Sequence, residues 1–482
     1  MSLQFITGGS GAGKSEYLSR LVCEESVRRP HDNFIVVVPE QYTMETQKKL
    51  VHMHSRKGIL NIDVVSFERL AYKVFEELGG GNRPVLDDTG KNLIVRRVLE
   101  KEKKKLDYFG SSIEKTGFVS ELKSVISELL QYGITPQQLG EIGENVKEKQ
   151  QLSAKLKDIR LVYKEFMAFL STNYITSEEI LDVLCGLVEK SKLIAGSEII
   201  FDGFTGFTPI QYKLMRLLLV YSKGIKISVT IDKKERPTGH EGWNNLFFMS
   251  KEMMNRLIAI CEEEGINVDD TVCVDRDINY RYEGAKDLAY LERNLFRYKG
   301  GVYTGTPENI RIYEGSNPKE ELQYIVSEIL QLTRKESFRY RDIAVVTADL
   351  ETYGKVAANM MKQNDIPAFL DYKRSVASNP YVEMLCSALE IVEKGYPYDT
   401  MFRYLRTGLT GISRHDIDML ENYCLAVGIR GSRAWHEPWK KKMKRSTYQP
   451  ELETLNALRE QIMAPFLNLE AVLKDKDRKS VV

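Results

Sequence analysis

The fold is decided by a short stretch near the start of the chain, Leu3-Gln4-Phe5-Ile6-Thr7 followed by Gly8-Gly9-Ser10-Gly11-Ala12-Gly13-Lys14-Ser15. The first run is apolar and predicts a short buried strand, and helical spacing of apolar residues begins after Lys14. The glycine-rich run between them satisfies the pattern G-x-x-x-x-G-K-S/T in the strand–loop–helix context that this pattern requires. The stretch therefore predicts a P-loop.

The residue types in this loop predict a site for ATP and Mg²⁺. Glycines allow backbone amides to turn toward phosphate oxygens, and the following helix adds positive potential at its N-terminus. We expect Lys14 to reach the β and γ phosphates and Ser15 to bind Mg²⁺. The predicted nucleotide-binding residues are Gly8, Gly9, Ser10, Gly11, Ala12, Gly13, Lys14 and Ser15.

Further apolar runs predict a parallel sheet around this unit. Residues 34–38 form a β-branched run that ends before Pro39, and similar runs cover 62–66, 198–201 and 224–231. They alternate with amphipathic helical stretches, a pattern typical of an α/β fold with a doubly wound parallel sheet. Residues 84–193 instead show helical spacing of apolar residues almost throughout, which predicts a helical insertion.

The strand–helix alternation resumes after a glycine-rich linker near residue 300. Apolar runs at 310–313, 342–347 and 366–370 predict strands, and the segments 318–332 and 350–363 predict helices between them. From residue 381 onward the pattern is helical again. The second half therefore predicts another α/β domain followed by helices.

Composition narrows the class of protein. With 482 residues we expect about two to four domains, and the net charge of +1 neither indicates nor excludes a polyanionic partner. The six cysteines contain no C-x-x-C pair, so neither a disulfide framework nor a zinc site is predicted. No apolar run is long enough to span a membrane and no signal peptide is recognisable, so we expect a cytoplasmic protein with no membrane partner.

Asp202 follows the predicted strand 198–201 and is a second candidate ligand for Mg²⁺. P-loop enzymes hold the metal with an acidic residue at a strand end, and a neighbouring carboxylate orients the attacking water. The next residue here is Gly203, which cannot act as a base. A common Asp-Gly turn at the strand end is the alternative reading of Asp202.

An ordered set of segments resembles superfamily 1 helicases of the UvrD and RecB type, and more closely the B subunits of AddAB (RexAB) helicase-nucleases. The segments are Val36-Val37-Val38-Pro39-Glu40-Gln41-Tyr42-Thr43, Val64-Val65-Ser66-Phe67-Glu68-Arg69-Leu70-Ala71, residues 202–211, and residues 320–325 with 340–346. The resemblance implies P-loop, RecA-like helicase-type domains with parallel sheets and helical insertions. It divides the chain into domain 1A (1–85 and 194–300), insertion 1B (86–193), a partial domain 2A (305–395) and the start of insertion 2B (396–482).

The resemblance also implies partners and cofactors. It implies a heterodimer with an A subunit of the AddA or RexA type, binding of DNA ends and single-stranded DNA, and a role in recombinational repair of double-strand breaks. Gln41, Ser66 and Phe67 lie in loops that face single-stranded DNA in related helicases, although surface-loop or core roles are open alternatives. Longer family members add a nuclease domain and an iron-sulfur cluster, for which no ligands are recognisable here. We therefore expect the chain to be an N-terminal portion of such a subunit.

Departures from the helicase pattern indicate that hydrolysis is impaired. Gly203 replaces the catalytic glutamate, residues 230–235 lack the Gly-Asp-x-x-Gln motif, and residues 316–319 supply no arginine. We expect nucleotide binding without useful turnover, and no catalytic residue is assigned. The alternatives are an active superfamily 1 helicase, a P-loop kinase or transferase, and a structural DNA-binding subunit with an empty P-loop.

Overall fold

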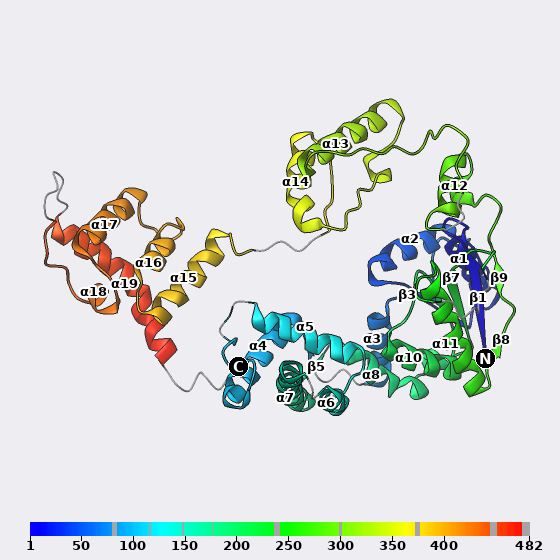
Figure 1. Cartoon of the computed structure of the whole chain (residues 1–482), viewed down its shortest axis with the longest axis horizontal. Coiled ribbons are helices and arrows are strands. Elements are labelled where there is room, and N and C mark those ends of the chain that lie inside the picture. The colour runs from blue at the N-terminus through cyan, green and yellow to red at the C-terminus, as the bar shows by residue number, and fades with distance from the viewer. Residues whose placement is uncertain are drawn as a thin grey trace. The chain divides into compact units, whose positions relative to one another are not determined.

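The computed structural model describes residues 1–79, 84–113, 115, 117–146, 149–176, 178–235, 242–297, 301–371, 376–443 and 451–474. The chain divides into two compact units, Met1–Arg311 and Ile312–Val482, and Figure 1 colours it from blue at the N-terminus to red at the C-terminus. The predicted end of domain 1A at residue 300 and the last residues of the predicted insertion 2B lie outside the described residues.

A parallel sheet forms the centre of the first unit, in the strand order β3-β2-β6-β7-β1-β8, with β9 also pairing with β1. The predicted strands are confirmed within one or two residues. Two short edge strands, β8 and β9, were not predicted, because two residues are too few to carry a hydrophobic pattern. The strands are β1 (Ser2–Gly8), β2 (Asn33–Val37), β3 (Ile62–Val65), β6 (Ser197–Phe201), β7 (Gly224–Thr230), β8 (Asn267–Val268) and β9 (Val272–Cys273).

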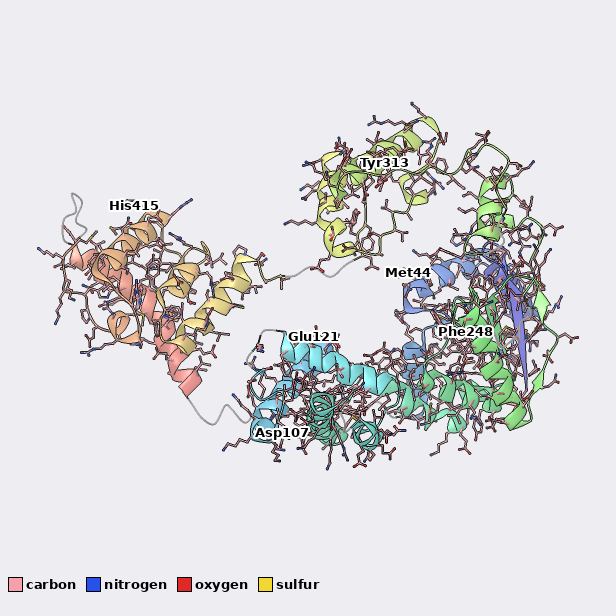
Figure 2. The ribbon with its side chains drawn as sticks, in the orientation of Figure 1. Met44, Asp107, Glu121, Phe248, Tyr313 and His415 are labelled. Atoms are coloured by element: carbon pink, nitrogen blue, oxygen red, sulfur yellow. The ribbon has the colours of Figure 1, made fainter. Side chains whose placement is uncertain are left out.

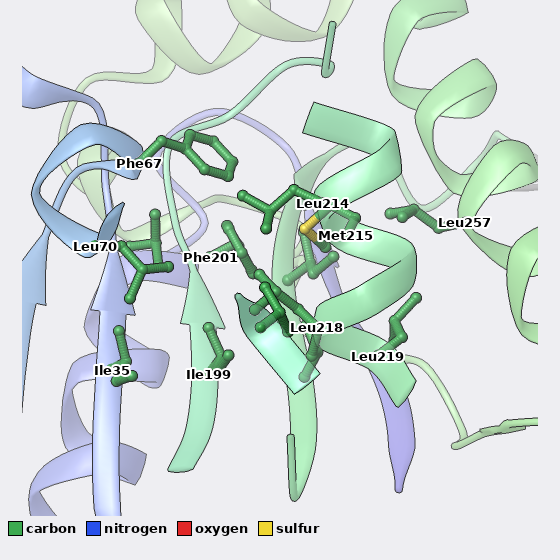
Figure 3. Close-up of a cluster of buried hydrophobic side chains, with 14 of the residues drawn as sticks. Ile35, Phe67, Leu70, Ile199, Phe201, Leu214, Met215, Leu218, Leu219 and Leu257 are labelled. Carbon is green, nitrogen blue, oxygen red and sulfur yellow. The ribbon is translucent and has the colours of Figure 1, made fainter. Parts of the chain in front are cut away.

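Helices cover both faces of this sheet, which explains why its strands are apolar along their whole length. In β2, Ile35 faces one hydrophobic core and Val36 faces the other. Figure 3 shows the larger core, where Phe201 of β6 packs beneath Leu214 and Leu218. One face carries α1 (Lys14–Arg28) and α2 (Thr43–Met53), and the other carries α3 (Phe67–Leu78), α8 (Ile180–Cys185), α10 (Pro209–Tyr221) and α11 (Phe248–Glu264).

Residues 84–193 are predominantly helical where the structure describes them, as predicted, and residues 86–170 share a hydrophobic core of their own. This segment contains α4 (Asp88–Glu102), α5 (Phe118–Gln131), α6 (Pro136–Asn145) and α7 (Gln150–Asn173), with a two-stranded parallel sheet of β4 (Val85–Leu86) and β5 (Ile175–Thr176) that was not predicted. The buried carboxylate of Asp158 accepts backbone N–H groups of Asp107, Tyr108 and Phe109 at 3.1, 2.8 and 2.9 Å. Asp107, labelled in Figure 2, thus belongs to a loop tied to α7.

Short elements complete the first unit. They are the 3-10 helices η1 (Glu40–Tyr42), η2 (Lys103–Lys105), η3 (Val188–Lys190) and η4 (Tyr280–Tyr282), and the helices α9 (Lys192–Ala195) and α12 (Lys286–Asn294). Two of them, η4 and α12, follow the edge strand β9 directly in sequence.

Residues 312–371 of the second unit contain both predicted helices, α13 (Pro318–Lys335) and α14 (Leu350–Gln363), which share a small core, and the short η5 (Tyr340–Asp342). The three predicted strands at 310–313, 342–347 and 366–370 are wrong: the described residues 301–371 contain no strand. Ile312, Val346 and Phe369 are 95%, 91% and 90% exposed. Strand propensity needs a hydrogen-bonded neighbour to form a ladder, and these segments pair with none among the described residues.

The described parts of residues 376–474 are mainly helical, as predicted. They form α15 (Pro380–Lys394), α16 (Tyr398–Leu405), α17 (Arg414–Val427), α18 (Ser432–His436) and α19 (Leu452–Lys474) around a core that contains Trp435 and Trp439. The buried Arg459 guanidinium donates to the carbonyl oxygen of Trp435 at 3.0 Å, which ties α19 to α18. No helix among the described residues is long and apolar enough to cross a membrane.

Candidate nucleotide-binding site

The glycine-rich loop joins the carboxyl end of β1 to the N-terminus of α1, as the sequence predicts. Gly11 and Gly13 have φ angles of 71° and 94°, in the left-handed region that favours glycine. Gly13 is the residue that precedes the first turn of α1. The two glycines therefore give the loop the curvature that points backbone amides and the helix N-terminus toward one place.

Lys14 lies folded over the beginning of the loop. Its Nζ donates to the carbonyl oxygens of Gly8 and Gly9, both at 2.9 Å. Burial lowers the pKa of Lys14, and the negative charges of Asp202, Asp275 and Glu292 oppose that shift. The ammonium group is therefore partly desolvated beside the loop, where its attraction for an anion is stronger than in water.

Asp202 lies at the carboxyl end of β6, on the strand between β2 and β7. Its carboxylate Oδ1 accepts the hydroxyl of Ser228 on β7 at 2.6 Å, and its backbone N–H donates to Val37 at 3.1 Å. Its charge acts on Lys14, so the structure brings these two predicted residues to one site. The Ser15 hydroxyl, the Asp202 carboxylate and phosphate oxygens are hard ligands of the kind that Mg²⁺ prefers, so the residues present fit Mg²⁺·ATP.

Gly203 has a backbone conformation that suits glycine alone. Its φ is 85°, and its N–H donates to the Ser228 hydroxyl at 3.3 Å. A Cβ here would lie 3.4 Å from Pro39 Cδ, so space is available and the strain comes from the φ angle. The position that carries a glutamate in the related helicases is thus shaped for a residue without a side chain.

Sequence reasoning missed a segment that closes over the loop, Asn279-Tyr280-Arg281 in and before η4. The Asn279 amide donates to Ser10 O at 3.3 Å, and the Arg281 backbone N–H donates to Gly11 O at 3.3 Å. The positive charge of Arg281 also lowers the pKa of Lys14. No arginine was found at residues 316–319, but the structure places this one against the P-loop. No short motif in the sequence signals this segment, because its contacts with the loop come from tertiary folding.

Asn279 and Tyr280 also constrain the loop sterically. The side-chain amide of Asn279 lies 3.2 Å from the point where a Cβ of Gly9 would be, and the Tyr280 ring lies 3.4 Å from that point on Gly13. The Arg276 guanidinium stacks on the Tyr280 ring, 3.5 Å from its centroid. Side chains at Gly9 and Gly13 would therefore disturb this covering segment.

The residues predicted to meet single-stranded DNA lie on two neighbouring loops. Gln41 is exposed in η1, and the Ser66 hydroxyl accepts the backbone N–H of Arg69 at 3.3 Å as the N-cap of α3. An ion pair of 3.0 Å between Glu40 and Arg69 joins the two loops. Phe67 is 8% exposed, and its ring packs against three phenylalanines, Phe201, Phe204 and Phe207. Ser66 and Phe67 thus have structural roles, and DNA contact by Gln41, Ser66 and Phe67 stays a prediction.

An ion-pair cluster occupies the segment after β7, where the Gly-Asp-x-x-Gln motif is absent. Asp232 pairs with Arg297 at 2.9 Å, and Glu235 pairs with Lys251 at 2.7 Å. Lys251 and Arg297 are 2% and 24% exposed in their side chains. The two acidic side chains of this segment are therefore paired with Lys251 of α11 and with Arg297, which follows α12.

The cysteines do not fit an iron-sulfur cluster. Within the part of the chain that the structure describes, no group of three or more His, Cys, Asp or Glu residues could hold a metal ion. All cysteines are free; Cys23, Cys185, Cys261 and Cys424 are buried, and Cys273 and Cys386 are exposed. The described residues therefore offer no ligand set for an iron-sulfur cluster.

Comparisons with known proteins agree with the geometry. A family described as "ADDB, N-terminal" matches residues 5–292. The chain is 41% identical over 479 residues to the B subunit of the ATP-dependent helicase/deoxyribonuclease of Lachnoclostridium phytofermentans, covering 99% of this chain and 42% of the relative. The B subunits of the same name from Clostridium novyi and Clostridioides difficile are 33% and 35% identical, with 99% of this chain and 41% and 42% of each relative covered. The chain thus spans less than half the length of these relatives.

Proposed function

The chain belongs to the family of AddB N-terminal regions, and from that premise we propose that it binds ATP and DNA as part of the B subunit of an ATP-dependent helicase/deoxyribonuclease. The complex would process double-strand DNA breaks for recombinational repair. The observation that carries the proposal is the P-loop geometry: Lys14 folds onto the carbonyl oxygens of Gly8 and Gly9 in the loop between β1 and α1, and the charge of Asp202 acts on Lys14.

The nucleotide site would use the whole loop, Gly8 to Ser15. Backbone amides of the loop and the start of α1 would hold phosphate oxygens, and Lys14, whose Nζ lies at the carbonyl oxygens of Gly8 and Gly9, would reach the β and γ phosphates from that end of the loop. Ser15 and Asp202 would hold Mg²⁺, which neutralises phosphate charge when bound. Arg281, which lies against Gly11, is positioned to add a further positive charge.

Hydrolysis by this chain would be slow or absent. Gly203 offers no carboxylate to orient an attacking water, and its left-handed backbone opposes any side chain there. The ion pairs around Asp232 and Glu235 replace a γ-phosphate sensor. The chain therefore acts as a nucleotide-binding partner, and an A subunit of the AddA or RexA type would drive translocation.

The family resemblance completes the proposal. Residues 1–85 and 194–300 would form domain 1A, 86–193 insertion 1B, 305–395 part of domain 2A, and 396–482 the start of insertion 2B. Gln41, Ser66 and Phe67 would contact single-stranded DNA from the loops joined by Glu40 and Arg69. The complex would work on DNA ends in the cytoplasm, and any iron-sulfur cluster would be held by residues other than those described here.

The test compares nucleotide affinity of the chain with that of Lys14→Ala, using Lys190→Ala as a control because Lys190 is exposed in η3. Loss of a charged hydrogen-bond donor to phosphate is expected to weaken Mg²⁺·ATP binding by about 10- to 100-fold, whereas Lys190→Ala leaves it unchanged. Equal affinity of the wild type and Lys14→Ala would refute the nucleotide site. DNA-stimulated phosphate release by the chain alone would instead favour an active helicase.

A further inference from the structure

A carboxylate of the chain lies beside the P-loop. Glu292 of α12 places Oε1 3.1 Å from the point where a Cβ of Gly9 would be. Burial raises the pKa of Glu292, and the backbone of Ser10 lowers it. The loop thus has an anionic side chain as a near neighbour.

A second carboxylate faces the same end of the loop. Asp275 Oδ1 lies 3.3 Å from the Cβ point of Gly9, is buried, and has no hydrogen-bond partner among the described residues. Its other oxygen, Oδ2, accepts the backbone N–H of Lys233 at 3.1 Å. The negative charges of Asp275 and Asp232 raise the pKa of Glu292, and the positive charge of Arg293 lowers it. The Gly9 end of the loop is therefore more acidic than its Gly13 end, which faces the Tyr280 ring.

The Gly9 end of the loop is also where we expect the terminal phosphate of a nucleotide to bind. In a P-loop the amides next to the helix hold the inner phosphates, and the lysine reaches the β and γ phosphates. Lys14 Nζ lies at the carbonyl oxygens of Gly8 and Gly9, at the beginning of the loop. We therefore expect the terminal phosphate of a bound nucleotide to lie at this end of the loop. A γ phosphate bound by Lys14 would meet Glu292 and Asp275, whereas a β phosphate near Gly13 would not.

We propose that Glu292, assisted by Asp275, determines the nucleotide selectivity of this site by opposing a terminal phosphate, so that a nucleoside diphosphate is bound more tightly relative to the triphosphate. The proposal rests on the nucleotide site proposed above. Two anions a few ångströms apart in a partly desolvated site repel each other, and the repulsion ends when one of them is made neutral. Glu292 thus opposes the γ phosphate more strongly than the inner phosphates, because repulsion between like charges weakens with distance.

The test measures the affinity of the whole chain for Mg²⁺·ADP and for the Mg²⁺ complex of the β,γ-imido analogue of ATP, by calorimetry. Glu292→Gln keeps the shape of the side chain and removes its charge. We expect about a tenfold gain in affinity for the triphosphate analogue, with ADP affinity changed less than about twofold. Asp275→Asn should change the ratio in the same direction, and Glu24→Gln, exposed on α1, should leave it unchanged.

The outcomes separate this inference from the proposed function. If the wild type binds neither nucleotide, the nucleotide site itself is refuted. If it binds both, but Glu292→Gln and Asp275→Asn leave the ADP-to-triphosphate ratio unchanged, the selectivity role is refuted and the site stands. Equal loss of both affinities in Glu292→Gln would give this residue a structural role only, which also overturns the inference.

Discussion

Two regions of the chain carry apolar runs that predict strands, and they fold differently. In the first unit, β2 and β6 pair with each other and with neighbours on both sides, and their side chains are buried under helices. In residues 301–371, the runs at 342–347 and 366–370 have no strand pairing among the described residues, and Val346 and Phe369 are almost fully exposed. The difference shows that such a run predicts a strand only where a ladder partner and a covering layer are available.

The largest expected effect is the difference in stability between two Phe→Ala substitutions, one in each region. Phe201 is fully buried in β6, so Phe201→Ala should lower the free energy of opening of the β2 and β6 amides by about 3–5 kcal/mol. Phe369 is 90% exposed, and Phe369→Ala should change stability by less than about 0.5 kcal/mol. Native-state hydrogen exchange measures both. A large cost for Phe369→Ala would show that the segment 366–370 is packed and would remove the contrast.

A smaller effect is expected where a side chain, and not a neighbouring strand, accepts the backbone hydrogen bonds of a segment. Asp158 accepts three backbone N–H groups of residues 107–109, so this loop is ordered without a strand. Asp158→Ala leaves those donors without their acceptor and should cost about 1–3 kcal/mol. The measurement is hydrogen exchange of the amides of residues 107–109 and of α7. Asp107→Ala, which removes a surface ion pair with Lys157, is the control and should leave α7 unchanged; equal effects of both variants would contradict this role of Asp158.

The smallest effect concerns the turn at the end of a paired strand. Gly203 follows β6 with a φ of 85°, so Gly203→Ala should destabilise the first unit by about 1–2 kcal/mol through backbone strain. Gly206 lies in the same loop without a positive φ, and its added Cβ would meet only Met249 Cε at 3.7 Å. Gly206→Ala should therefore be close to neutral. Thermal unfolding of the two variants tests the difference, and equal melting temperatures would contradict the strain.

The sequence predicted those features that depend on local patterns. The strands of the large sheet are continuous apolar runs, and the P-loop is a contiguous motif, so both were found at the right residues. The two-residue strands β4, β5, β8 and β9 are too short for a pattern, and the strands expected in 301–371 depend on partners that a local pattern cannot reveal.

The residues that surround the P-loop were harder to predict. Asp202 could be named as a candidate because it follows a strand directly, and its charge acts on Lys14. Its role in holding Mg²⁺ stays a prediction. Arg281 and Glu292 were missed, because they reach the loop from η4 and α12, far away in sequence. Tertiary folding, which no short motif encodes, determines their contacts with Gly9, Ser10 and Gly11.

The backbone of Gly203 also limits which residues this turn accepts. A glutamate there would inherit a φ of 85° and would lie beside Pro39 and the hydroxyl of Ser228. Backbone strain of about 1–2 kcal/mol would accompany the new carboxylate. The substitution Gly203→Glu would therefore add a negative charge beside Asp202 at a cost in the stability of the first unit.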